Sequence, residues 1–352
     1  MSKPLSILVV KLSAIGDVIH ALPVSYAIKE TYPDARLVWV VEPVARPLLE
    51  GNPCIDEIIT FEKKKFKSLG GFLREFGPLR KKIRAAAGKP EGYDYALDLQ
   101  GLFKSAAIVW ASGAKKCYGS EYMRELSDKV STPVVGPHAN GHIVERYLDV
   151  ARAIGCRVDE VKFPVAISEK EEWSAGELLR RAGVKDGTPY AVLAVGANWP
   201  NKRWPTKKYA ELSDRLFDAG VIPVFVGGGA ADESSMAEIN SYVNIPPVSL
   251  VNQTSLKELA AVIKGAAVAL GGDTGPIHLA AAVETPAVMV MGPTAPDRSS
   301  PYGMDEDCLL AGHPCANCRK RACPKGIDCL DAISVDRVYE KLMEVVGRAS
   351  LN

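Results

Sequence analysis

The sequence lacks the features that would place a chain across a membrane or along nucleic acid. No apolar run approaches the roughly 20 residues that a transmembrane helix needs. The apolar run at residues 5–10 is too short for the core of a signal peptide, and Lys11 follows it at once. The formal net charge is only +1, which argues against a protein built for nonspecific binding of nucleic acid. We therefore expect a cytoplasmic protein whose contact with any membrane is peripheral.

What is present is the composition of a globular protein. The chain has 352 residues, of which 47% are hydrophobic and 24% charged, and this length is typical of about two domains. Apolar runs alternate with segments of helical spacing in both halves, as in βαβ units. The sequence thus predicts an α/β fold with a doubly wound parallel sheet in each half and a domain boundary near residue 168. The expected strands span residues 5–10, 37–42, 55–61, 95–99, 190–195, 221–226, 266–270 and 287–291.

The stretch of residues 270–294 carries the clearest binding signal. An apolar run ends at two glycines, and Asp273, Thr274 and Gly275 follow before an Ala-rich helix that carries His278. Such a turn lies at the edge of an α/β sheet where ligands bind, and a helix N-terminus favours an anion such as phosphate. Asp273 and Thr274 could simply cap the helix. The glycines before them and the histidine after them are more than a cap requires.

Two other strand ends in the second half resemble phosphate-binding turns. Lys202 follows a strand and could meet a phosphate as a point charge, with Trp199 and Trp204 either sheltering it or packing elsewhere. Three glycines at 227–229 follow the next strand, and they would let the backbone approach a ligand closely.

Polar residues also mark two strand ends in the first half. Asp17 lies at the junction between the first strand and the helix that follows it. A carboxylate there is either an N-cap or a group that takes a proton from a hydroxyl, and position alone weighs the two equally. Gln100 ends the strand at 95–99 and could face the same edge. We interpret His20 as a residue of the helix face.

The charge is unevenly distributed along the chain. Residues 61–89 hold ten basic residues against two acidic ones, a local net charge of +8, with four interleaved phenylalanines. A charged run is usually a solvated helical face, but the aromatic residues make a surface for an anionic, partly apolar partner equally plausible. A lipid headgroup or a lipid-linked sugar fits such a surface better than nucleic acid does. The basic residues are Lys63, Lys64, Lys65, Lys67, Arg74, Arg80, Lys81, Lys82, Arg84 and Lys89.

The cysteines fall into two groups. Cys54, Cys117 and Cys156 are scattered and are expected to be buried thiols, whereas five others cluster after residue 307. The spacing C-x2-C-x4-C-x5-C of the last four matches no standard zinc-finger or ferredoxin pattern, and a cytoplasmic protein should not carry stable disulfides. We expect a compact loop with buried thiols; a zinc or iron–sulfur site is the less favoured alternative. The clustered residues are Cys308, Cys315, Cys318, Cys323 and Cys329, with His313 nearby.

Four segments together resemble glycosyltransferase family 9, the ADP-heptose:lipopolysaccharide heptosyltransferases. They are residues 11–24 (KLSAIGDVIHALPV), 95–106 (YALDLQGLFKSA), 201–205 (NKRWP) and 271–294 (GGDTGPIHLAAAVETPAVMVMGPT). The segments follow the order of the family, and the resemblance covers nearly the whole chain. It is closest to heptosyltransferase I, while the Cys-rich tail resembles heptosyltransferase II.

The resemblance implies a GT-B fold, in which two Rossmann-like domains face each other across a cleft. Residues 1–168 would bind the acceptor and residues 169–352 the ADP-sugar, and the final helix at 336–348 could pack back on the first domain. The implied reaction is an inverting transfer of L-glycero-D-manno-heptose from ADP-heptose to the Kdo or heptosyl inner-core region of lipopolysaccharide. It would take place at the cytoplasmic face of the inner membrane. No cofactor is required, and Mg²⁺ is not expected to be held by the protein.

The resemblance also assigns roles to residues. Asp17 matches the catalytic carboxylate, the general base, and Lys202 matches the lysine that meets the donor phosphate. The donor-binding turn corresponds to Asp273, Thr274, Gly275 and His278. We expect the acceptor to contact Lys63, Lys64, Lys65, Lys67 and Gln100.

The sequence departs from heptosyltransferase I at two positions. Ala197 and Asn198 stand where that enzyme has a pair of threonines before the lysine. Gly229 stands where it has a glutamate that contacts the donor, and Asp232 or Glu233 could substitute. We keep Asn198 and Gly229 among the expected donor-binding residues.

Two other functions stay open at this point. A GT-B sugar-nucleotide epimerase would act on the nucleotide sugar alone and would need neither an acceptor nor a basic surface. A non-catalytic assembly factor that binds an ADP-sugar would keep the turn from Asp273 to His278 but would tolerate loss of Asp17.

Overall fold

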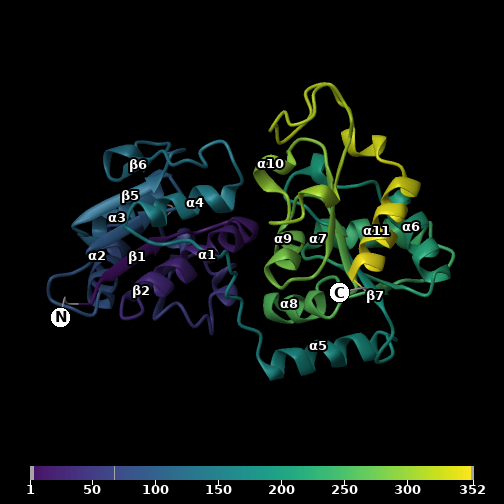
Figure 1. The fold of residues 1–352 in the computed structure, drawn as a ribbon, viewed down its shortest axis with the longest axis horizontal. Coiled ribbons are helices and arrows are strands. Elements are labelled where there is room, and N and C mark those ends of the chain that lie inside the picture. Colours follow the sequence, from purple (N-terminus) through teal and green to yellow (C-terminus); the bar gives the residue numbers. More distant parts are fainter. Residues whose placement is uncertain (1–3, 67, 350–352) are drawn as a thin grey trace. The chain divides into compact units, whose positions relative to one another are not determined.

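The computed structural model describes residues 4–66 and 68–349 (Figure 1). The chain forms two compact units, Met1–Ala166 and Ile167–Asn352, and the boundary expected near residue 168 lies two residues further along. In the part of the chain that the structure describes, no helix is both long enough and apolar enough to cross a membrane.

The first unit is a six-stranded parallel sheet covered by helices. The strand order is β3-β2-β1-β4-β5-β6. Its strands are β1 (Ser6–Val10), β2 (Arg36–Val41), β3 (Glu57–Thr60), β4 (Tyr95–Asp98), β5 (Lys116–Ser120) and β6 (Thr132–Val134). Its helices are α1 (Ile15–Thr31), α2 (Leu69–Ala86), α3 (Phe103–Ser112) and α4 (Ile143–Arg152), with short 3₁₀ turns η1 (Arg46–Leu48), η2 (Lys63–Phe66) and η3 (Ser127–Lys129).

The second unit repeats this architecture with its own six-stranded parallel sheet. The strand order is β12-β11-β10-β7-β8-β9. Its strands are β7 (Tyr190–Ala194), β8 (Ile222–Val226), β9 (Val248–Ser249), β10 (Val268–Gly271), β11 (Ala287–Met291) and β12 (Cys308–Leu310). Its helices are α5 (Glu169–Arg181), α6 (Thr206–Asp218), α7 (Ala230–Asn240), α8 (Leu256–Lys264), α9 (Gly275–Ala282), α10 (Pro296–Ser299) and α11 (Val335–Ala349), with 3₁₀ turns η4 (Pro200–Lys202), η5 (Asp305–Asp307) and η6 (Cys329–Ala332).

The central strands are apolar along their whole length because both faces of each sheet are covered. All five residues of β1, β7 and β11 are buried, as are all four of β10. A one-sided sheet would show alternation of apolar and polar residues instead. The continuous apolar runs of the sequence therefore correspond to the interior strands of two doubly wound sheets.

Each sheet reverses its strand order at one place. In the first unit the reversal lies between β1 and β4, which pair directly, and in the second it lies between β7 and β10. At such a switch point the loops after the two strands diverge to opposite faces of the sheet and leave room for a ligand. The loops that follow these four strands carry most of the residues singled out from the sequence.

The last helix, α11, contributes to the core of the second unit. Val338, Leu342 and Val345 are buried together with Trp204 of the segment before α6. The apolar face that could have packed back on the N-terminal domain is therefore enclosed within the unit to which the helix belongs. Its sequence pattern indicated an apolar face but not the surface against which that face would pack.

Candidate functional site

Three side chains meet at the switch point of the second sheet. Lys202 follows β7 and Asp273 follows β10, and the Lys202 Nζ lies 2.6 Å from the Asp273 Oδ2. The other carboxylate oxygen of Asp273 lies 2.9 Å from Nε2 of His278, on the first turn of α9. Because a carboxylate can only accept, this contact assigns the proton of His278 to Nε2. The sequence motif therefore folds into a Lys–Asp–His array with the carboxylate in the middle.

The array is shielded from water, and its charges support one another. The side chains of Lys202, Asp273 and His278 are 14%, 10% and 4% exposed. Burial by itself would raise the pKa of Asp273, but His278 and Lys202 outweigh it and hold the pKa well below its usual range. Asp273 is thus a fixed anion that orients the histidine and the lysine. It cannot serve as a proton donor at neutral pH.

Two further residues contact the array. The ring of Trp199 lies 4.5 Å from the Lys202 Nζ, so the tryptophan shelters the ammonium as a cation–π partner. Ser299 donates its hydroxyl to the Asp273 Oδ2 at 3.3 Å. Trp204 instead packs in the core, where its Nε1 donates to the carbonyl of Ile333. Nothing in the sequence around Ser299 pointed to this contact.

The glycines before Asp273 are required by a close approach of two loops. A Cβ on Gly272 would lie 1.9 Å from the carbonyl oxygen of Lys202, so any side chain there would push the two loops apart. Thr274 occupies the N-cap position of α9, yet its side chain makes no capping hydrogen bond to another described residue. The capping role considered for Asp273 and Thr274 is therefore wrong, since Asp273 binds Lys202 and His278 instead. Gly275 begins α9, Pro276 has no N–H, and the N–H of Ile277 donates to the carbonyl of Thr274 at 3.1 Å, which leaves the Gly275 N–H as the donor at this helix end.

Asp232 contacts two neighbouring loops of the second unit and holds them together. Its Oδ2 accepts the N–H of Gly228 at 2.9 Å, and its Oδ1 lies 3.0 Å from the Arg203 Nη2. A Cβ on Gly196 would lie 2.1 Å from the same carboxylate. Both oxygens of Asp232 thus hold the loops after β7 and β8 in place, and its suggested contact with the donor stays a prediction. Glu233, in contrast, is exposed on the first turn of α7.

The remaining predicted donor residues lie on the same two loops. Gly229 adopts φ +96° directly before α7, a conformation that favours glycine, and its N–H donates to the Asn252 Oδ1 at 2.7 Å. Asn198 is exposed between β7 and η4. A glutamate at position 229 would therefore have to adopt a strained backbone.

In the first unit, Asp17 lies on the first turn of α1. Its Oδ2 accepts the N–H of Ala14 at 3.0 Å, so the carboxylate closes the start of the helix, and the side chain is half-buried. The N-cap interpretation of Asp17 is wrong, because Ala14 is the N-cap residue and Asp17 is the third residue of α1, from which its carboxylate reaches back to the N–H of the N-cap. That contact also fixes the direction of the side chain, which is what a positioned base requires.

Lys11 helps to hold the loop that carries Asp17 in place. This lysine is 3% exposed, and its ammonium donates to the carbonyl of Leu99 at 3.0 Å and to the Tyr147 hydroxyl at 2.7 Å. Burial opposes its charge, but Tyr147 and Asp17 outweigh burial, and the pKa of Lys11 is raised. Sequence reasoning missed Lys11 and Tyr147, although a lysine directly after an apolar strand was a usable signal.

Gln100 helps to fix the same loop. Its side-chain oxygen accepts the N–H of Leu12 at 3.0 Å and that of Ser13 at 3.1 Å. Gln100 thus joins the ends of β1 and β4 across the switch point. Its predicted contact with an acceptor stays a prediction, and the positioning of the β1–α1 loop is an additional role.

The three lysines of the turn η2 are exposed. Lys63, Lys64 and Lys65 form the turn η2, and Lys65 pairs with Glu62 at 2.8 Å. Lys67 lies outside the described residues. The structure thus leaves the ammonium groups of η2 accessible to an anionic partner.

The Cys-rich segment packs against the loops of the Lys–Asp–His array. The Asn317 N–H donates to the carbonyl of Gly292 at 2.9 Å, and the Asn201 Nδ2 donates to the carbonyl of Lys320 at 2.7 Å. The expectation of buried thiols is wrong here, because Cys318 is exposed and its three neighbours in the pattern are partly exposed. Hydrogen bonds from the backbone at residues 325–327 lower the pKa of the Cys323 thiol. Within residues 4–66 and 68–349, no group of three or more metal-binding side chains is arranged to hold an ion.

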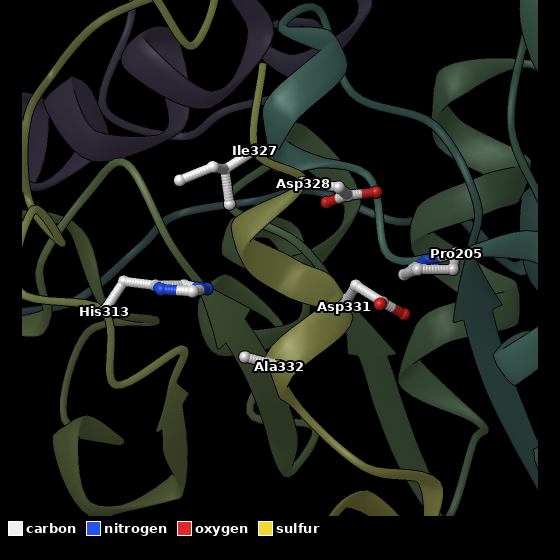
Figure 2. A pocket seen from close by; sticks show the side chains of 6 residues that line it. All are labelled: Pro205, His313, Ile327, Asp328, Asp331 and Ala332. Carbon is white, nitrogen blue, oxygen red and sulfur yellow. The ribbon is translucent and has the colours of Figure 1, made fainter. Parts of the chain in front are cut away.

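A pocket of about 610 Å³ lies beside this segment (Figure 2). Its lining includes Asp328, Asp331 and His313, and Lys208 reaches Asp331 at 3.0 Å. Two carboxylates at its wall make it a poor match for a diphosphate. The anion-binding features of this unit are therefore found at the Lys–Asp–His array instead.

Comparison with known sequences identifies relatives of this chain. The sequence model described as "Glycosyltransferase family 9 (heptosyltransferase)" matches residues 79–327. Lipopolysaccharide heptosyltransferase 1 of Escherichia coli K12 is 28% identical over 250 residues, which cover 68% of this chain and 75% of that protein.

Solved structures share the fold over almost the whole chain. The glycosyltransferase family 9 protein of Veillonella parvula has a TM-score of 0.82 at 21% identity and covers 97% of both chains. E. coli heptosyltransferase WaaC, solved with ADP, has a TM-score of 0.72 at 24% identity and covers 96% of this chain and 99% of its own. The two Rossmann-like units are those of the GT-B fold, which confirms the fold expected from the sequence.

Proposed function

This chain belongs to glycosyltransferase family 9, and from that premise we propose that it is an inverting ADP-heptose:lipopolysaccharide heptosyltransferase. The Lys202–Asp273–His278 array, inside the segment that matches the family, is the observation that carries the proposal. It offers a cation, an oriented imidazole and a helix N-terminus within one shielded turn. That combination suits the diphosphate of a nucleotide sugar.

The donor half of the mechanism concerns the leaving group. When the bond between the heptose anomeric carbon and the diphosphate oxygen breaks, negative charge develops on the departing ADP. Lys202 and the N–H of Gly275 at the start of α9 stabilise that charge, while Asp273 keeps the lysine in place. Thr274, Gly275, Asn198 and Gly229 line the loops around the nucleotide and sugar.

The acceptor half requires a base. An acceptor hydroxyl is a weak nucleophile at neutral pH, and Asp17 takes its proton as the oxygen attacks the anomeric carbon. The attack comes from the face opposite the leaving diphosphate, so the configuration at that carbon inverts. Lys11 and Gln100 act through the loop and keep the Asp17 carboxylate where the hydroxyl arrives.

The acceptor is the Kdo or heptosyl inner core of lipopolysaccharide, which carries carboxylates and phosphates. The exposed lysines of η2, together with Lys67, supply the complementary charge. Because this acceptor is anchored in lipid, the enzyme works at the cytoplasmic face of the inner membrane. ADP-heptose is a substrate, and no protein-bound cofactor is part of the proposal.

The test is ADP release from ADP-heptose by the purified full-length chain, with and without Kdo-bearing lipid A. We expect release that depends on the acceptor, and we expect Asp17→Asn to keep donor binding while turnover falls about 1,000-fold, within the range for loss of a positioned base. Strong residual turnover by Asp17→Asn would remove the aspartate from this role. Binding of ADP-heptose without release in the presence of any core acceptor would contradict the transferase.

A further inference from the structure

A continuous apolar surface on the first unit is not used by the proposed chemistry. Its exposed members are Leu73 on α2 and Phe103 and Trp110 on α3, with exposed fractions of 71%, 62% and 58%. Single exposed apolar residues are normal on protein surfaces, but three large ones on two adjacent helices need an explanation. Figure 1 shows α2 and α3 next to one another, and the two helices pack together.

The exposed tryptophan is the outer end of an aromatic ladder that starts in the core. Phe61, at the end of β3, is only 5% exposed, and successive ring centroids are 4.9, 6.4, 4.9 and 6.0 Å apart. The ladder therefore holds Trp110 in one orientation, so little conformational freedom is lost when its outer face is covered. The rings in order belong to Phe61, Phe66, Phe72, Phe76 and Trp110.

Positive charge accompanies this surface. The guanidinium of Arg80 lies 5.3 Å from the Trp110 ring centroid, and Leu73 is seven residues before Arg80, hence on the same stripe of α2. Lys81 follows on the same helix and is exposed. Tryptophan beside arginine, with a lysine at the rim, is the composition of a protein surface at the headgroup level of a bilayer.

One end of this surface lies near the edge of the first sheet at which the acceptor is expected to bind. Phe103 is the first residue of α3 and follows Gln100 by three positions, and Gln100 contacts the β1–α1 loop at the switch point. Trp110 is seven residues further along, two turns away on the same stripe of α3. A bilayer against this stripe would thus lie beside the loop that carries Asp17.

We propose that Leu73, Phe103 and Trp110, rimmed by Arg80 and Lys81, form a docking surface for a bilayer that contains anionic lipid. The proposal goes beyond heptose transfer, since it concerns bulk phospholipid and needs neither donor nor acceptor. The apolar side chains enter the headgroup region, and the basic rim binds lipid phosphates. Such docking would keep the enzyme at the surface where a lipid-anchored substrate is found.

The test is sedimentation of the full chain with phosphatidylcholine–phosphatidylglycerol vesicles, compared with vesicles of phosphatidylcholine alone. We expect binding to the anionic vesicles that weakens as salt is added, and at least roughly tenfold weaker partitioning for Leu73→Ser and Trp110→Ser. Trp173→Ser is the matched control, because Trp173 is 66% exposed on α5 of the other unit and should bind as wild type does.

Measurements of stability and activity distinguish a loss of vesicle binding from a folding defect. Leu73 is the most exposed of the three residues, so Leu73→Ser should retain the wild-type melting temperature even if Trp110→Ser weakens the ladder. Because vesicle binding is measured without sugar substrates, failure of the heptosyltransferase proposal would not alter it. If the enzyme transfers heptose, Leu73→Ser should lower the rate on a vesicle-borne acceptor and spare a deacylated, soluble one.

Three outcomes would overturn the proposal. One is that the wild-type chain does not sediment with anionic vesicles. Another is that Leu73→Ser binds as well as wild type or that Trp173→Ser loses binding equally. The third is self-association that Leu73→Ser abolishes, seen by gel filtration without vesicle binding, which would assign the surface to a second copy of the chain.

Discussion

Asp273 is the residue on which the proposed donor site depends. It binds a lysine 71 positions earlier in the chain and a histidine five positions later, using both carboxylate oxygens. A carboxylate placed between two such partners stays ionised, and it holds the lysine at a defined place before any ligand arrives. The charge that the departing diphosphate meets is therefore preorganised.

The first prediction concerns that charge. Lys202→Met keeps a side chain of similar length but removes the ammonium. We therefore expect the rate of heptose transfer from ADP-heptose to fall by about 100-fold. Titration calorimetry should also show weaker binding of ADP. Lys207→Met is the control, since Lys207 lies over the exposed Tyr242 ring on the same unit and should behave as wild type. Unchanged ADP affinity in Lys202→Met would exclude this lysine from the phosphate site.

A second prediction at this scale concerns Lys11, a positioning residue. Lys11→Met fills a similar volume but leaves the carbonyl of Leu99 and the hydroxyl of Tyr147 without their buried donor. We expect kcat to fall roughly 10- to 100-fold because the Asp17 loop shifts, with donor KM nearly unchanged. Tyr147→Phe, which removes only one of the two contacts, should lose less. A proportional rise in both KM values with kcat preserved would argue against positioning.

At the scale of elements, neighbouring strands are joined by side-chain contacts in addition to the backbone hydrogen bonds of the sheet. Asp94 lies just before β4 and accepts the N–H of Ser6 at the start of β1, at 2.9 Å. Lys89 and Lys115 pair with the same carboxylate, the latter at 2.8 Å. Burial by itself would raise the pKa of Asp94, but these hydrogen bonds lower it to about 2.

Asp94 has a lower pKa in the folded state than in the unfolded state, so its ionisation stabilises the fold at pH values above the unfolded-state pKa. This stabilisation is lost as the pH falls through the folded-state pKa. Asp94→Asn should therefore lower the free energy of unfolding at pH 7 by on the order of 1 kcal/mol, a figure reduced for the solvent-exposed lysines. The difference from wild type should shrink below about pH 4 and vanish near pH 2. Urea unfolding across this range measures it, with Asp128→Asn as a surface control. A difference that does not change with pH would contradict the ionic origin.

At the scale of the whole molecule, two units of the same architecture carry different chemistry. The first presents Asp17 and the basic segment, and the second presents the Lys–Asp–His array. Asp17 and the Lys–Asp–His array follow strands that flank a switch point, where neighbouring loops diverge and leave backbone groups accessible, whereas the basic segment follows the edge strand β3. The proposed function assigns the acceptor to the first unit and the ADP-sugar to the second, so variants in one unit should affect one substrate more than the other.

The prediction that follows concerns the basic segment. Replacing Lys63, Lys64 and Lys65 by glutamine should raise the KM for the acceptor by about tenfold, the sum of three exposed charge contacts, and should spare the KM for ADP-heptose. The effect should diminish as salt is added, since these charges are exposed. Equal changes in both KM values would indicate a folding defect. The melting temperature of the variant provides that check.

Much of this protein is determined by the sequence alone. The interior strands β1, β7, β10 and β11 are evident as continuous apolar runs, because a strand covered on both faces leaves no place for polar residues. The donor turn is equally local: two glycines, an aspartate and a helix start within a few residues specify its geometry. Membership of glycosyltransferase family 9 follows from such segments and their order.

Features that depend on pairing between distant segments of the chain could be known only from the tertiary structure. Strand order, and with it the two switch points, depends on contacts between segments far apart in the chain. The edge strands β6, β9 and β12, of three, two and three residues, are too short to show a pattern of their own. Lys11 became a positioning residue only because Leu99, 88 positions away, lies beside it. Asp232 became a brace for the same reason, since a carboxylate's role is set by the partners that folding brings to it.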